Sequence, residues 1–274
     1  MTTPAPTATA TAAARRPGLA TEVATWPPVE AVDVDGWRVG FSEGFTRRGN
    51  SVAALRAPGD VEAALDRTED LCAARGLPAV VRVCRDSAPD DLDARLARRG
   101  YAVAAPTSVM VRDLASPPGP GDLPPGLEIA DRPTAAWLHG WLGVKAAQRE
   151  VDLALAERLL RGAPAAYLTL RADRREDGDL GVIRAAVADG WVGLSCLAVA
   201  PAARRTGVGR LLTLAALDHA RTLGAGWAFL QVEEGNAAAR ALYEGLRFEV
   251  SDRYHYRERP VDLPSRPARE TLGA

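Results

Sequence analysis

The sequence predicts an α/β protein built around a mixed sheet. Apolar runs with the length of strands alternate along the chain with segments of helical periodicity. A Pro- and Gly-rich segment, 116–126, separates two regions that each show this alternation. With 274 residues, of which 47% are hydrophobic, the chain can form one large or two small domains with a buried core.

Composition divides the chain into five segments. Residues 1–25 are rich in Ala, Thr and Pro and lack the apolar stretch of a signal peptide, so we expect a disordered tail there. Two lobes are expected at 26–115 and 127–260, joined by the linker 116–126. Residues 261–274 are expected to form a second tail.

The C-terminal region begins with a short strand and two helices, continues with three strands, and then alternates helix and strand. Asp189-Gly190 joins two of these strands and is typical of a hairpin. The expected strands are 127–130, 166–171, 182–188, 192–200, 227–232 and one starting at 248, and the expected helices are 134–147, 152–161, 209–223 and 236–244.

The N-terminal region repeats the last part of that order. A helix at 61–75 is followed by a strand at 77–83, a helix at 90–98 and a strand starting near Tyr101. The repeat predicts two lobes of related architecture. An unrelated α/β half-domain would show the same succession, so this alternative stays open.

Charge and residue usage argue against several classes of function. A formal net charge of −1 does not favour nucleic acid or an anionic membrane as a partner. Cys72, Cys84 and Cys196 lack metal-type spacing and the histidines are scattered, so we expect no metal site and reduced thiols in a cytoplasmic protein. No apolar run has the length of a membrane span.

One segment places glycines and cationic side chains directly before a helix. Glycines let backbone N–H groups approach a ligand, and a helix N-terminus adds unpaired donors and a partial positive charge. Such a cradle suits a pyrophosphate. The spacing is neither a dinucleotide fingerprint nor a nucleotide P-loop. The segment reads Arg204-Arg205-Thr206-Gly207-Val208-Gly209-Arg210.

Two further motifs follow this segment along the chain. The apolar strand 227–232 precedes a helix that begins at Asn236 and contains Leu242-Tyr243. Together with Arg-x-x-Gly-x-Gly, these motifs resemble the GNAT superfamily of N-acetyltransferases over residues 191–257. The resemblance implies a GNAT fold in two tandem lobes, acetyl-CoA as co-substrate, and acetyl transfer to a primary amine of a small metabolite.

The N-terminal lobe departs from this pattern. Asp60, at the start of the helix 61–75, would repel a phosphate, and the helix 90–98 contains no tyrosine. We therefore expect a degenerate lobe that serves as a scaffold or as a wall of the acceptor site.

The resemblance also implies which residues bind the cofactor. Backbone amides of the 205–209 loop would hold its phosphates, with nearby arginines as counter-charges, and a backbone N–H of the strand 192–200 would polarise the thioester carbonyl. Asn236 would cap its helix, contact the pantetheine arm, or do both. The complete set is Leu197, Ala198, Val199, Arg204, Arg205, Thr206, Gly207, Val208, Gly209, Arg210, Asn236 and Tyr243.

Tyr243 is the implied proton donor to the leaving thiolate, because a phenol with a pKa of about 10 is protonated at neutral pH. No general base is evident, since the strand 192–200 contains no Asp, Glu or His. Glu233 is the candidate nearest in sequence. Two alternatives stay open: Glu233 is only an exposed loop charge, or an ordered water accepts the proton. The donor-rich segment 45–51 either reaches the acceptor or forms a solvated strand edge.

Two rival functions remain at this stage. The absent base fits a non-catalytic acyl-CoA-binding or regulatory module, and protein acetylation at a lysine or an N-terminus would use the same chemistry. We expect a small-molecule amine as the partner, no nucleic acid or membrane, and a monomer or homodimer.

Overall fold

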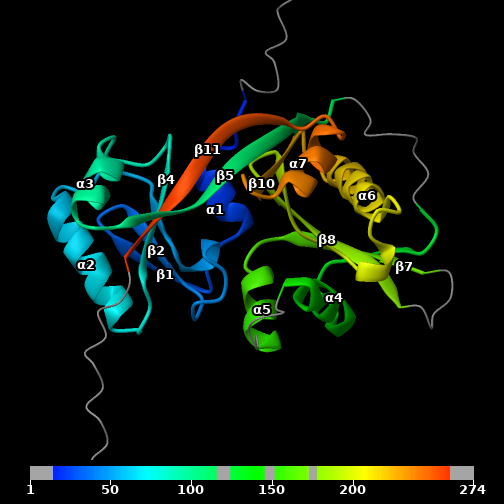
Figure 1. Ribbon diagram of the computed structural model, residues 1–274, viewed down its shortest axis with the longest axis horizontal. Coiled ribbons are helices and arrows are strands. Elements are labelled where there is room, and N and C mark those ends of the chain that lie inside the picture. Colours follow the sequence, from blue (N-terminus) through cyan, green and yellow to red (C-terminus); the bar gives the residue numbers. More distant parts are fainter. Residues whose placement is uncertain (1–14, 116–123, 146–151, 173–177, 260–274) are drawn as a thin grey trace, which may run out of the picture.

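The computed structural model describes residues 15–115, 124–145, 152–172 and 178–259. Their strands form one mixed sheet of 11 strands (Figure 1), which confirms the expected α/β class. The order across the sheet is β1-β2-β3-β4-β11-β5-β10-β9-β8-β7-β6. The strands are β1 (Glu30–Val34), β2 (Trp37–Phe41), β3 (Val52–Ala54), β4 (Ala79–Cys84), β5 (Ala102–Asp113), β6 (Leu127–Ala130), β7 (Ala165–Arg171), β8 (Asp179–Ala188), β9 (Trp191–Val199), β10 (Trp227–Glu233) and β11 (Glu249–Arg259).

The helices lie close to their expected positions. Every helix and strand expected from the sequence is present, within a few residues of its expected bounds, whereas β1 to β3 and α1 were not among the expected elements. The helices are α1 (Gly18–Thr25), α2 (Val61–Ala73), α3 (Leu92–Arg98), α4 (Ala135–Lys145), α5 (Leu153–Leu160), α6 (Val208–Thr222) and α7 (Ala237–Glu244), with short 3-10 turns η2 (Arg48–Asn50) and η4 (Pro201–Ala203).

Helices cover both faces of the sheet around β8 and β9. Val182 and Ile183 are successive residues of β8, and alternate residues of a strand point to opposite faces. Ile183 packs in a cluster with residues of α6, whereas Val182 packs with tryptophans of α4. Consequently α6 and α4 lie on opposite sides of these strands (Figure 1).

Helix α1 corrects the expectation of a disordered tail up to residue 25. Its Leu19 and Glu22 are buried, and the Leu19 N–H donates to a carboxylate oxygen of Asp86 at 3.1 Å. An isolated helix of 8 residues is marginal in water, so this one depends on contacts with distant parts of the chain. Composition could not reveal those contacts. The remaining expected tail residues, 1–14 and 261–274, lie outside the described residues.

The two halves of the chain exchange strands. The strand β5 precedes the expected linker, yet it pairs with β10 from Trp227 to Glu233. The last strand, β11, in turn lies between β4 and β5. Figure 1 shows β5 and β11 running side by side across the molecule. Each half therefore completes the sheet of the other. Most of the linker lies outside the described residues, so the lobe boundary there stays a prediction.

A buried arginine joins helices from both halves. Arg184 on β8 is 1% exposed, and its guanidinium donates to the carbonyls of Thr25 and Leu160, at 2.9 Å each. These carbonyls lie at the ends of α1 and α5. The Arg184 guanidinium also lies 5.3 Å from the ring centroid of Trp26. Backbone carbonyls and an aromatic face thus surround this cation.

Replacing this arginine should destabilise the protein. Arg184→Ala removes three buried hydrogen bonds, two to these carbonyls and one to the Tyr167 hydroxyl, and leaves a cavity, so we expect the free energy of unfolding to fall by about 3 kcal/mol. Urea denaturation followed by circular dichroism measures this difference. Arg67→Ala, at an exposed position of α2, is the control and should change stability by less than about 0.5 kcal/mol. Equal stability of the two variants would contradict this role of Arg184.

Candidate active site

The parallel strands β9 and β10 diverge in the middle of the sheet. They pair from Trp191 with Trp227 up to Leu194 with Leu230. Beyond that point β9 continues to Val199 and β10 to Glu233 without pairing with each other. A gap between two neighbouring strands leaves backbone groups that a ligand can bind.

A bulge accompanies the divergence. The register of β9 against β8 shifts between Ser195 and Ala198, and Cys196 has a φ of 58°. A β-bulge bends its strand and changes the direction of the following groups. The bend turns the segment that contains Leu197 away from the regular ladder, as a strand that leaves its neighbour requires.

A cavity of about 660 Å³ lies at the divergence. Its wall includes residues 194–198 of β9, 230–233 of β10, and Tyr243 of α7. The N-terminal half contributes Trp26, the loop 44–48 and Thr107, and further wall residues come from α4 and β11. The cavity is therefore built by both halves of the chain.

The glycine-rich loop lies beside this cavity. Helix α6 begins at Val208, directly after Gly207, whose φ of 92° is the left-handed conformation that glycine adopts easily. No side chain caps the helix, so its first N–H groups are without a side-chain acceptor. A Cβ at Gly209 would lie 3.7 Å from side-chain carbons of Leu197 and Val199. The start of α6 is thus next to the diverging strand.

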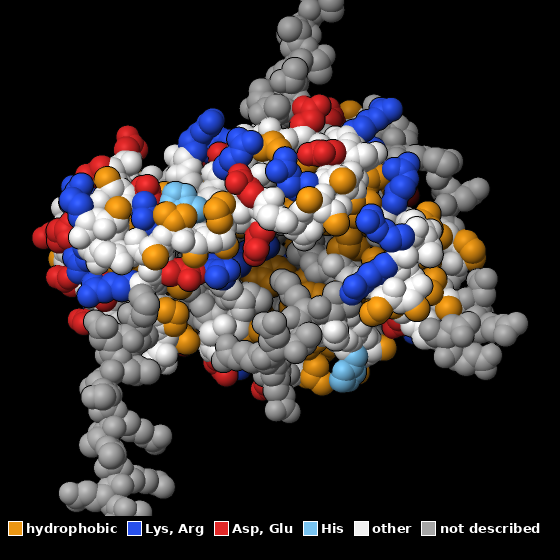
Figure 2. Space-filling model, viewed as in Figure 1, with side chains coloured by type: hydrophobic (Ala, Val, Ile, Leu, Met, Phe, Trp, Pro, Cys, Tyr) orange, Lys and Arg blue, Asp and Glu red, His pale blue; other side chains and the backbone are white. Residues whose placement is uncertain are grey.

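Basic side chains surround this helix start. Arg204, Arg205 and Arg210 are exposed, and Figure 2 shows a group of Lys and Arg side chains over α6. The Arg204 Nε donates to the carbonyl of Val199 at 3.3 Å, which links the loop to β9. Thr206 Oγ1 donates to the carbonyl of Ala203 at 2.7 Å and stabilises the turn.

Tyr243 lies in the cavity wall. Its side chain is 9% exposed and contacts the ring of Phe248, with centroids 5.8 Å apart. Burial raises the pKa of its phenol to about 12. Within the described part of the chain, no residue forms a hydrogen bond with its hydroxyl, which leaves that group available to a ligand.

Two other expected site residues also line the cavity. Asn236 caps α7, because its Oδ1 accepts a hydrogen bond from the Ala239 N–H at 3.1 Å. This confirms the capping interpretation, and a pantetheine contact stays a prediction. Glu233 is exposed at the end of β10. Its role as a base also stays a prediction.

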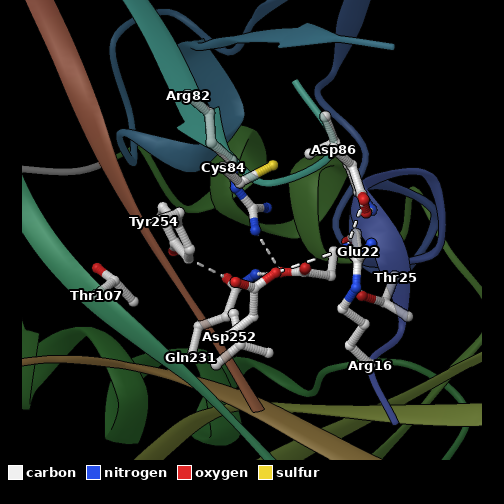
Figure 3. A network of polar contacts seen from close by, with 12 residues as sticks. Arg16, Glu22, Thr25, Arg82, Cys84, Asp86, Thr107, Gln231, Asp252 and Tyr254 are labelled. Atoms are coloured by element: carbon white, nitrogen blue, oxygen red, sulfur yellow. Dashed lines mark hydrogen bonds and ion pairs between the residues drawn. The ribbon is translucent and has the colours of Figure 1, made fainter. Parts of the chain in front are cut away.

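A buried polar network that was not predicted from the sequence lies behind the cavity (Figure 3). The Arg82 Nη2 lies 2.5 Å from Glu22 Oε2, and the side-chain amide of Gln231 donates to the same carboxylate oxygen. The Tyr254 hydroxyl donates to Gln231 Oε1 at 3.3 Å. Gln231 and Tyr254 both line the cavity. Burial opposes the charge of Arg82, yet the carboxylate of Glu22, together with Tyr254, Tyr256 and Cys84, raises the arginine's pKa overall.

Among the described ranges, no group of three or more His, Cys, Asp or Glu side chains is arranged to hold a metal ion. No helix in those ranges is long and apolar enough to span a membrane.

Known proteins resemble the chain over most of its length. The family model described as "Probable histone acetyltransferase Rv0428c C-terminal" matches residues 11–257. The "Uncharacterized N-acetyltransferase YobR" of Bacillus subtilis is 26% identical over 85% of this chain and 94% of its own. The mycothiol acetyltransferase of Saccharopolyspora erythraea is 31% identical over 69% of this chain and 66% of its own.

Shorter matches and solved structures agree with this result. The mycothiol acetyltransferase of Thermobispora bispora is 48% identical, but the match covers only 22% of this chain and 21% of that protein. A GCN5-related N-acetyltransferase from Kribbella flavida superimposes with a TM-score of 0.61 at 17% identity, covering 84% of this chain and 89% of its own.

A tandem GNAT protein from the clavulanic acid biosynthesis pathway gives a TM-score of 0.57 at 19% identity, covering 75% of this chain and 70% of its own. The two structural neighbours share the fold of this chain. Because the family model spans most of its length, the chain belongs to that acetyltransferase family and, with it, to the GNAT superfamily of N-acetyltransferases.

Proposed function

We propose that the protein transfers an acetyl group from acetyl-CoA to a primary amine of a small metabolite, by direct attack in a ternary complex. One observation carries this proposal. The uncapped start of α6, the separated edge of β9 and the buried phenol of Tyr243 lie around the same divergence of two strands.

The residues present fit acetyl-CoA. The start of α6 offers N–H donors and a partial positive charge to the phosphates, and a Cβ at Gly207 would meet no atom within 4 Å, so the approach is open. The exposed arginines 204, 205 and 210 add charge. The separated part of β9, which contains Leu197, Ala198 and Val199, offers backbone groups to the pantetheine arm.

The acyl transfer itself requires two contributions from the protein, stabilisation of the oxyanion and a proton for the thiolate. Acetyl-CoA supplies an acyl carbon that is activated as a thioester, and the amine nitrogen forms a bond to that carbon as the carbon–sulfur bond breaks. We assign a backbone N–H of β9 to the developing oxyanion, an arrangement that typically gives 10²–10³-fold in rate. Tyr243 donates its proton to the departing thiolate, and its raised pKa keeps it protonated at neutral pH.

The amine must also lose a proton. Glu233 is a carboxylate in the cavity wall, so we assign it as the acceptor of that proton. It is exposed at the end of β10, where solvent can carry the proton away. An ordered water is the alternative acceptor. The cytoplasmic location expected from the cysteines and the monomeric or dimeric state are further parts of this proposal.

A second candidate is acetylation of a protein lysine. The description of the matching family, a probable histone acetyltransferase, favours it. The walls that α4 and the loop 44–48 add to the cavity favour a small amine instead. Measuring thiol release from acetyl-CoA with small amines and with lysine-containing peptides decides between the two. A lack of turnover with every amine, combined with tight binding of CoA, would instead indicate a non-catalytic module.

Removing the Tyr243 hydroxyl should slow the transfer. In Tyr243→Phe the ring still packs against Phe248, but the proton donor is lost, so we expect kcat to fall by about 10²–10⁴-fold. The Kd of CoA, measured by calorimetry, should stay within about twofold of the wild-type value, because the phenyl ring of phenylalanine fills nearly the same space as the phenol of tyrosine. An unchanged kcat would contradict the assignment of Tyr243 as the acid.

A carboxylate at the start of α6 should weaken CoA binding. A Cβ at Gly209 finds only ordinary van der Waals contacts, and an acidic group in the first turn of a helix does not destabilise it. Gly209→Asp should therefore fold, but repel the phosphates and raise the Kd of CoA by about tenfold or more. Calorimetry measures this, with Gly226→Asp in an exposed loop as the control. Unchanged affinity in Gly209→Asp would place the phosphates elsewhere.

A further inference from the structure

The loop 44–48 contributes two arginines to the cavity wall. We propose that this loop, through Arg48, binds an anionic group of the acceptor, a carboxylate or a phosphate. The acceptor is then a primary amine that carries this anion next to an aromatic or bulky apolar body. This inference rests on the proposed function and specifies its substrate class.

The loop is held in a fixed shape. The side-chain oxygen of Asn50 accepts hydrogen bonds from the N–H groups of Ser42 at 2.7 Å and Gly44 at 2.9 Å. Its amide nitrogen donates to the carbonyls of Phe45 and Thr46, both at 2.8 Å. One side chain therefore holds both ends of the turn. A site that is formed before the ligand binds loses little entropy on binding.

The two arginines differ in their partners. Arg47 forms an ion pair with Glu258 and lies 5.7 Å from the ring centroid of Tyr256. Arg48 lies over the ring of Trp26, with its guanidinium carbon 4.9 Å from the centroid, and has no acidic partner among the described residues. Arg48 is thus a half-buried cation whose charge is not balanced by a neighbouring carboxylate.

Nearby acidic groups are already engaged. Glu22 lines a small adjoining pocket together with Arg48, but its carboxylate is bound by Arg82 and Gln231. The charged side chains in the main cavity wall are Arg47, Arg48 and Glu233, and Glu258 compensates Arg47 from outside that wall. An anion on the ligand would balance Arg48, because guanidinium groups bind carboxylate and phosphate with paired hydrogen bonds.

Aromatic rings next to Arg48 define the rest of the acceptor. Trp26 and Phe45 both contact Trp141, with centroid distances of 6.3 and 5.7 Å. Tyr254 and Tyr256 form a second edge-to-face pair in the same wall, 5.4 Å apart. These surfaces suit an apolar or aromatic body. The positive wall also favours the neutral form of an amine, which is the form that attacks.

Equilibrium binding tests the anion site without relying on turnover. The probes are 3-phenylpropanoate, its uncharged analogue 3-phenylpropanol, and 2-phenylethyl phosphonate, each titrated by calorimetry into the CoA-loaded protein. At least one anion should bind about tenfold or more tightly than the alcohol, and the tighter of the two identifies the anionic group. Equal binding of the alcohol and both anions would overturn the inference.

Variants locate the contact. Arg48→Gln should raise the Kd of the preferred anion by about 10- to 100-fold and leave that of the alcohol unchanged. Arg48→Lys keeps the charge but loses the paired geometry, so it should give an intermediate Kd. Arg67→Gln, at an exposed position on α2, should bind like the wild type. Wild-type affinity in Arg48→Gln would also overturn the inference.

A kinetic comparison separates this inference from the proposed function. Phenylalanine and 2-phenylethylamine differ by one carboxylate, and 2-amino-3-phenylpropylphosphonate adds a phosphonate. The anionic amine should have a KM about tenfold or more lower than 2-phenylethylamine, and Arg48→Gln should remove this preference. Equal KM values overturn the inference and leave acetyl transfer intact. No acetylation of any amine overturns the proposed function itself.

Discussion

The separation of β9 from β10 is the constraint on which the rest of the site depends. Two parallel strands that pair up to Leu194 and Leu230 and then part leave backbone groups without strand partners inside a sheet. Such groups are costly to bury unless something binds them. The cavity, the start of α6 and Tyr243 all adjoin this gap. A ligand with amide groups of its own can continue the ladder there, as the pantetheine arm of CoA would.

Strand exchange determines which half of the chain builds each wall of the cavity. Because β5 lies beside β10 and β11 lies beside β4, the two halves cannot move apart without breaking the sheet. Arg184 adds a second connection between α1 and α5. In the N-terminal half the Asp60 carboxylate caps the start of α2, and Trp26 and the loop 44–48 contribute to the wall. Under the proposed function, its contribution is the shape and charge of the acceptor side.

Structural elements that a few neighbouring residues encode could be predicted from the sequence. The turn from Arg204 to Gly209 and the helix that carries Tyr243 are each encoded within a few residues, so their positions were predictable. Helix α1 and the contact of Glu22 with Arg82 depend on residues about 60 positions apart or more, and no local pattern encodes them. Gln231 was the available hint, since an amide in an apolar strand needs a partner when it is buried.

Hydrogen–deuterium exchange with and without CoA tests the central claim most directly, because it reports on the backbone groups themselves. The account predicts that CoA slows exchange in two separate segments, the separated part of β9 around Leu197 to Val199 and the first turn of α6 around Gly207 to Arg210. Protection confined to α6 would contradict a ligand between the strands. Unchanged exchange in both segments at saturating CoA would contradict the account as a whole.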